Sequence, residues 1–127
     1  MELRFNATEI GCTEDEGALL CGASNSMDDA APYHYIIISG CSDPDDGDDD
    51  GTYFEIDDQI NGNYNLLTSC TVSSGEITIG LLHGVPWHPD LNRVVIGCES
   101  ATREQFDGLV AGLRRLFRPE DFRIESQ

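Results

Sequence analysis

Only one segment of this chain repeats its apolar residues with the period of a helix. From Phe106 to Phe117 the apolar residues fall three or four positions apart, which places them in one stripe along a helical surface. Thr102 and Gln105 have the spacing of a capping box, and Pro119 cannot continue a helix. We therefore expect a single helix near the carboxyl end, beginning near Thr102.

Before this helix, apolar residues come in short alternating or β-branched runs, which is the pattern of strands. The expected strands cover residues 3–7, 18–21, 33–38, 52–56, 66–72, 76–81 and 93–98. Short connections between them favour antiparallel pairing. The predicted fold class is α+β, with an antiparallel sheet of about six or seven strands and one C-terminal helix packed on one face. At this length, residues 1–127 are expected to form a single domain.

The net charge of −17 lies entirely in the first 92 residues. These hold 18 of the 24 acidic residues and only one of the 7 basic residues, Arg4, while the last 35 residues balance six arginines with six acids. A face this negative repels nucleic acid and anionic lipid and attracts cations or a basic protein. We therefore expect neither nucleic acid nor a membrane as partner.

The negative charge is densest at residues 43–51, where six of nine positions are aspartate. A run of this composition is typical of a solvated, flexible loop, and such a loop can become ordered when it binds a partner. We expect it to offer a contact surface to a basic protein through Asp45, Asp46, Asp48, Asp49 and Asp50.

The same run also has the spacing of a calcium-binding loop. Asp46, Asp48, Asp50 and Gly51 stand at positions 1, 3, 5 and 6 of such a loop, with Asp57 at position 12. The pattern departs from the usual one because the last ligand is an aspartate and because the flanks have strand patterns instead of helical ones. A calcium-binding β-rich module is therefore the alternative to the contact surface and to a simple solvated loop.

Candidate catalytic residues are few. Glu55 and Asp57 lie two positions apart, which puts both carboxylates on one face of a strand. Paired carboxylates perform hydrolysis only in a cleft that separates their pKa values, and beside the aspartate run a solvated face is expected instead. The chain has no glycine-rich phosphate loop and no Ser-His-Asp signature, so we expect neither an enzyme nor a cofactor.

The amino terminus indicates a cytoplasmic protein, and this location sets what we expect of the cysteines. The five cysteines contain no Cys-x-x-Cys pair, and the amino-terminal residues lack the basic-then-apolar order of a signal peptide. In a reducing cytosol we expect free thiols that act mostly as small core residues.

A proline-bounded loop at residues 82–89 contains the only tryptophan, Trp87. His83 and His88 flank it, but no third metal ligand is close in sequence. The tryptophan could fill the core beneath the loop or stand exposed as a binding anchor, and the sequence leaves both alternatives open.

Three segments, taken in order, resemble the tenth immunity-protein family of bacterial polymorphic toxin systems. They are the opening strand Met1 to Phe5, the centre Tyr53 to Tyr64, and the helix end Leu113 to Phe117. Family members often have two glycines after the second tyrosine, where this chain has Asn65 and Leu66.

The resemblance implies a non-enzymatic immunity protein that binds and blocks a cognate toxin domain in the cytoplasm. Many toxins attack nucleic acids with basic clefts, which an acidic surface captures quickly. Because affinity also requires desolvated aromatic anchors, we expect contacts from Tyr53, Tyr64 and Trp87, together with Glu55.

Overall fold

The computed structural model describes residues 1–25, 33–41 and 52–125. In chain order the elements are β1 (Glu2–Asn6), β2 (Glu9–Asp15), β3 (Ala18–Ser24), β4 (Tyr35–Cys41), β5 (Tyr53–Ile56), β6 (Asp58–Tyr64), β7 (Leu67–Ser73), β8 (Glu76–Leu81), β9 (Arg93–Gly97), α1 (Arg103–Leu116), the 3₁₀ helix η1 (Pro119–Asp121) and β10 (Phe122–Ile124). The α+β class is confirmed by these elements.

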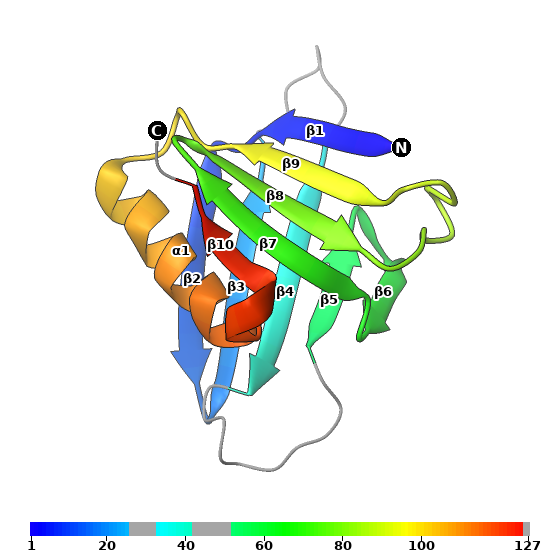
Figure 1. Ribbon diagram of the computed structural model, residues 1–127, viewed down its shortest axis with the longest axis horizontal. Coiled ribbons are helices and arrows are strands. Elements are labelled where there is room, and N and C mark those ends of the chain that lie inside the picture. Colours follow the sequence, from blue (N-terminus) through cyan, green and yellow to red (C-terminus); the bar gives the residue numbers. More distant parts are fainter. Residues whose placement is uncertain (26–32, 42–51, 126–127) are drawn as a thin grey trace.

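The strands form two sheets that face each other (Figure 1). The first sheet has the order β1-β9-β8-β7-β10, and the second sheet is a meander of β2-β3-β4-β5-β6. The prediction of one antiparallel sheet of six or seven strands is therefore wrong. The chain changes from one sheet to the other after β1 and again after β6. The first sheet is also not purely antiparallel, because β1 adds to β9 and β10 adds to β7, both in parallel.

Three of the described strands were missed because their sequences lack a strand pattern. β2 contains three acids and a glycine, β6 is rich in residues typical of turns, and β10 is only three residues long. β2 is nevertheless paired with β3 over its whole length, from Glu9 opposite Ser24 to Asp15 opposite Ala18. Pairing with a strongly apolar neighbour thus overrides the weak local preference.

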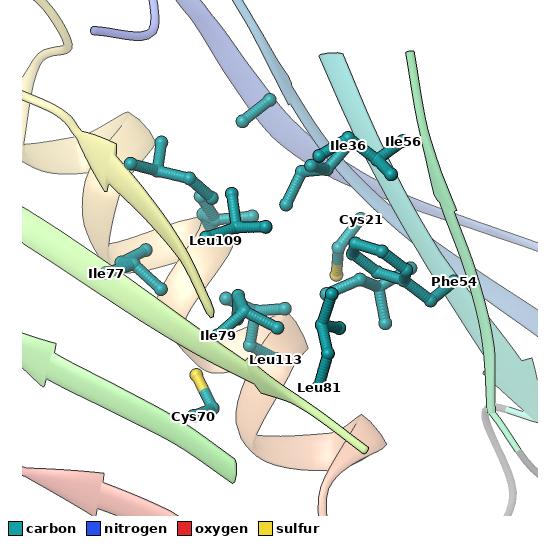
Figure 2. Packing of buried hydrophobic residues seen from close by; sticks show 14 of the residues in the cluster. Cys21, Ile36, Phe54, Ile56, Cys70, Ile77, Ile79, Leu81, Leu109 and Leu113 are labelled. Atoms are coloured by element: carbon teal, nitrogen blue, oxygen red, sulfur yellow. The ribbon is translucent and has the colours of Figure 1, made fainter. Parts of the chain in front are cut away.

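The core lies between the two sheets, as Figure 2 shows. Ile36 and Phe54 come from the second sheet and meet Ile77 and Ile79 of the first. Alternate residues of each strand point to this layer, since side chains in a strand alternate between its two faces. Burying one such side chain stabilises the fold by about 1.5–3 kcal/mol relative to leaving it exposed.

The helix α1 begins at the predicted capping box. Thr102 Oγ1 accepts a hydrogen bond from the Gln105 amide at 3.1 Å, and Gln105 Oε1 accepts one from the Thr102 amide at 2.9 Å. Leu109 and Leu113 of the apolar stripe are buried in the core cluster. The helix packs against β2, β3 and β4, so it covers the inner face of the second sheet where the first sheet does not reach (Figure 1).

The expectation of free thiols is wrong for two cysteines, because Cys12 of β2 and Cys21 of β3 form a disulfide. They stand directly opposite each other in the sheet register, which brings their Cα atoms within 4.1 Å. Gly112 of the helix lies against both sulfur atoms. Cys70 and Cys98 are free and buried, as expected, and burial raises the pKa of their thiols to about 12 and about 11.

Candidate interaction face

One face of the second sheet points away from the core, and we call it the open face. The sheet register arranges its side chains in three rows across the strands. The first row is Thr13, Leu20, Ser39, Tyr53 and Tyr64, the second is Gly11, Gly22, Ile37 and Glu55, and the third is Glu9, Ser24 and Tyr35. Large side chains on both outer rows flank a middle row that begins with two glycines.

Several apolar and aromatic side chains on this face are exposed. Leu20 is 44% exposed and Tyr64 is 52% exposed. Tyr33, which precedes β4, is exposed to a similar degree and packs against Tyr35 with ring centroids 6.1 Å apart. Exposed aromatic side chains of this density are more typical of binding surfaces than of a solvated sheet.

Glu55 lies in the middle of the open face, yet it is only 7% exposed. Tyr35 donates its hydroxyl hydrogen to Glu55 Oε2 at 2.5 Å, and Tyr53 donates to Oε1 at 2.7 Å. The pKa of Tyr35 is raised mainly by burial and then by the hydrogen bond to Glu55. The pKa of Tyr53 is raised to about 12, mainly by its hydrogen bond to Glu55 and then by burial. Two neutral phenols therefore hold one carboxylate in place on an aromatic surface.

Strand β6, next to Glu55, has a glycine where the Tyr53 ring needs space. A Cβ atom on Gly62 of β6 would collide with the Tyr53 hydroxyl, so a larger residue there would displace the ring from Glu55. The Tyr53 ring also meets Tyr64 edge to face, with centroids 5.3 Å apart. The structure thus brings together three of the predicted binding residues, Tyr53, Glu55 and Tyr64.

Asp57, in the turn between β5 and β6, has a different set of partners. His34 Nδ1 and His88 Nε2 each lie 3.0 Å from Asp57 Oδ2. The backbone amide of Tyr35 lies 3.3 Å from the other carboxylate oxygen. Because an ionised carboxylate only accepts hydrogen bonds, each histidine ring must carry a proton on the nitrogen that faces Asp57. Sequence reasoning missed His34, since no motif connects it with Asp57.

This geometry decides between the two alternatives for Trp87. The loop that carries it is held by His88 and by the Trp87 backbone amide, which donates to Asn61 Oδ1 at 3.0 Å. The side chain itself is 55% exposed, so the alternative that it fills the core is wrong.

The expectation that Glu55 and Asp57 belong to a solvated face is wrong, because both carboxylates are only 7% exposed. The alternative of a hydrolytic carboxylate pair gains no support from their surroundings either. A register shift between Phe54 and Ile56 interrupts the regular alternation, and Asp57 takes a left-handed backbone with φ of 66°. One carboxylate is occupied by tyrosines and the other by histidines. This arrangement is suited to fixing side chains in place, because each carboxylate has its own set of hydrogen-bond partners.

The aspartate run lies outside the described residues, and with it Asp45, Asp46, Asp48, Asp49 and Asp50. Of the proposed calcium ligands the structure describes only Asp57, whose carboxylate contacts two histidines and a backbone amide. Within the described ranges, no group of three or more His, Cys, Asp or Glu side chains is placed to hold a metal ion. His83 is directed to the Gly84 carbonyl instead of to His88.

In the part of the chain that the structure describes, no helix is both long and apolar enough to cross a membrane. Comparisons of the chain with protein-family models, with curated proteins and with solved structures find no match.

Proposed function

We propose that this protein is an immunity-type inhibitor that binds a cognate basic toxin domain and blocks it by direct occlusion in the cytoplasm. The proposal combines the segment resemblance with the charge and chemistry of the open face. It is a non-enzymatic role that requires no cofactor, and its partner is a protein.

One observation carries the proposal: the second sheet contains no basic residue. No lysine or arginine occurs between Arg4 and Arg93, a stretch that includes all five strands β2 to β6. The arginines lie on the first sheet, on α1 and at Arg118 just after it. Several of them pair with acids, including Arg115 of α1, which lies 3.1 Å from Glu14 of β2. Arg4, for example, lies 2.9 Å from Glu76 and 3.4 Å from Glu2.

This separation of charge gives the molecule two unlike sides. On the first sheet the charges are locally balanced, whereas the second sheet bears Glu9, Glu55 and Asp58 on strands without a cation. A basic partner approaching the protein is therefore attracted towards the second sheet and the acidic run that joins β4 to β5.

Tight binding also requires a surface from which the partner can exclude water, and exposed aromatic side chains supply it. Tyr53 and Tyr64 belong to the open face, and Trp87 is exposed on the loop anchored to Asp57 and Asn61. Tyrosine and tryptophan dominate interface hot spots because they bury large areas at low entropic cost. The negative charge is thus expected to set the rate at which the partner associates. The aromatic rings are expected to set the lifetime of the complex.

The experiment is affinity capture of the partner from a lysate of the producing organism at low and high salt, read by mass spectrometry. The captured protein is then expressed in a host cell with and without this chain. We expect a basic protein whose recovery falls with salt and whose toxicity is suppressed by the chain. Recovery of only acidic proteins, or of a partner that is not toxic, would count against the proposal.

The alternative, a calcium-binding module using Asp46, Asp48, Asp50 and Asp57, is tested separately. Such a module would bind calcium with a dissociation constant in the micromolar range and would gain melting temperature by mass action. Since Asp57 is engaged by His34 and His88, we expect no shift in melting temperature at millimolar calcium. A shift that disappears in the Asp46→Asn variant would establish the calcium site instead.

A further inference from the structure

The open face is hollowed where its middle row begins. Gly11 of β2 stands directly opposite Gly22 of β3, and neither carries a side chain. The space above them is a shallow hollow of about 320 Å³, bordered by Tyr33, Tyr35 and Ile37. It is open to solvent and has room for a large side chain.

Two acidic residues make the surroundings of this hollow negative. Glu9 borders it directly at the edge strand and is exposed. Glu55 lies one strand beyond Ile37, and its carboxylate accepts the hydroxyl hydrogen of Tyr35, which lines the hollow. A phenol that donates to a carboxylate carries more electron density in its ring, so the ring attracts a cation more strongly.

The apolar border and the acids together suit a side chain with an aliphatic stem and a cationic end. Ile37 and the tyrosine rings can cover the stem, while Glu9 can pair with the charge. A guanidinium fits better than an ammonium because it is planar, stacks on aromatic rings and is more weakly hydrated. An anionic group would be repelled by Glu9, and a purely aliphatic group would leave Glu9 without a cationic partner.

We propose that the hollow over Gly11 and Gly22 is the pocket in which an arginine side chain of the protein partner binds, stacked on Tyr33 and Tyr35 and paired with Glu9. The proposal rests on the proposed function for the source of the arginine. It places a specific contact on the described sheet, separate from the acidic run at residues 43–51.

The first test uses the purified protein and needs no toxin. Backbone amide resonances are followed during titration with N-acetyl-arginine amide and, in parallel, with its uncharged analogue N-acetyl-citrulline amide. We expect saturable shifts confined to Tyr33 and strands β2 to β4 with the arginine compound only, at a dissociation constant of about 1–10 mM for one side chain. Equal shifts with both compounds, or shifts elsewhere in the protein, would overturn the proposal.

The variant Gly11→Leu fills the hollow. A Cβ on Gly11 meets no atom within 4 Å, so the added side chain occupies the hollow without disturbing the strand. Thr13→Leu is the matched control, because it adds an apolar side chain to the same strand one row away. Gly11→Leu should weaken binding of the arginine compound at least tenfold, whereas Thr13→Leu should leave it unchanged; an equal effect of both would contradict the assignment.

The second test measures affinity for the captured toxin. Gly11→Leu should weaken toxin binding at least tenfold. Gly108→Leu should not, because it makes the same change at an exposed position of α1, away from the open face, where a Cβ also meets no atom within 4 Å. If both variants bind and neutralise the toxin like the wild type, the pocket proposal fails while the proposed function stands. If the arginine compound binds as expected but the captured partner is not toxic, the proposed function fails and the pocket remains as an arginine site for another protein.

Discussion

Asp57 Oδ2 and His88 Nε2 lie 3.0 Å apart, and this contact joins the loop that carries Trp87 to the end of the second sheet. His34 reaches the same oxygen from the start of β4. A single buried carboxylate therefore connects three segments that are distant in sequence, and it fixes where the exposed tryptophan stands relative to the open face.

We predict that Asp57→Asn destabilises the protein by about 1–3 kcal/mol, because both histidines lose a charged acceptor. Asparagine tolerates the left-handed backbone at this position, so the change isolates the carboxylate. The control is Asp58→Asn, whose side chain can still accept from the Ile60 amide and should shift the free energy of unfolding by less than about 0.5 kcal/mol. Equal urea midpoints for the two variants would contradict this role.

Reduction should also destabilise the fold. Closing the short loop between Cys12 and Cys21 lowers the entropy of the unfolded chain, and we expect loss of the bond to cost about 2–3 kcal/mol. Peptide mapping after alkylation of the unreduced protein should recover residues 12 and 21 in one cross-linked pair. Finding both cysteines alkylated before reduction would show that the bond is absent in the protein as purified.

The helix is predicted to be sensitive to volume at Gly112 and insensitive at Gly108. A Cβ on Gly112 would collide with the sulfur atoms of Cys12 and Cys21, whereas a Cβ on Gly108 meets nothing within 4 Å. Gly112→Ala should therefore destabilise by about 1–3 kcal/mol through overpacking. Gly108→Ala should stabilise by up to about 1 kcal/mol through helix propensity, as thermal melts of the two variants will show.

The contact between Tyr53 and Glu55 makes a prediction for alkaline pH. The pKa of Tyr53 is raised in the folded protein to about 12 from its ordinary value of 10. Its contribution to stability is therefore fully present below pH 10 and is lost as the pH rises towards 12. Urea unfolding at several pH values should show a steeper decline for the wild type than for Tyr53→Phe; parallel declines would be inconsistent with the contact.

The sequence predicted the elements that have strong periodicity and missed those whose order depends on pairing. The helix, its capping box and the strands with β-branched runs were predictable from local pattern, because burial and capping act within a few residues. β2 and β10 become strands only because β3 and β7 lie beside them. The division into two sheets depends on long-range pairing, such as that of β1 with β9, so a local pattern could not predict it.

The candidate site was also predicted only in the parts that local sequence determines. Tyr53, Glu55 and Tyr64 were predicted from their position beside the acidic run, and the structure does bring them together. The parts that were missed arise from contacts across the sheet, such as Gly11 opposite Gly22 and Tyr35 beside Glu55. Glycine in a strand that faces another glycine is a signal of a hollow only when the register is known.

The measurement that tests the central claim most directly is growth rescue with the partner captured at low salt. That partner is expressed in a host cell alone, with the wild-type chain, or with a variant in which Tyr53, Tyr64 and Trp87 are replaced by alanine. We predict arrested growth alone, full growth with the wild type, and loss of protection with the triple variant, whose fold is checked by its thermal melt. Protection by a folded triple variant would contradict the aromatic contact surface, and failure of the wild type to protect would contradict the immunity function itself.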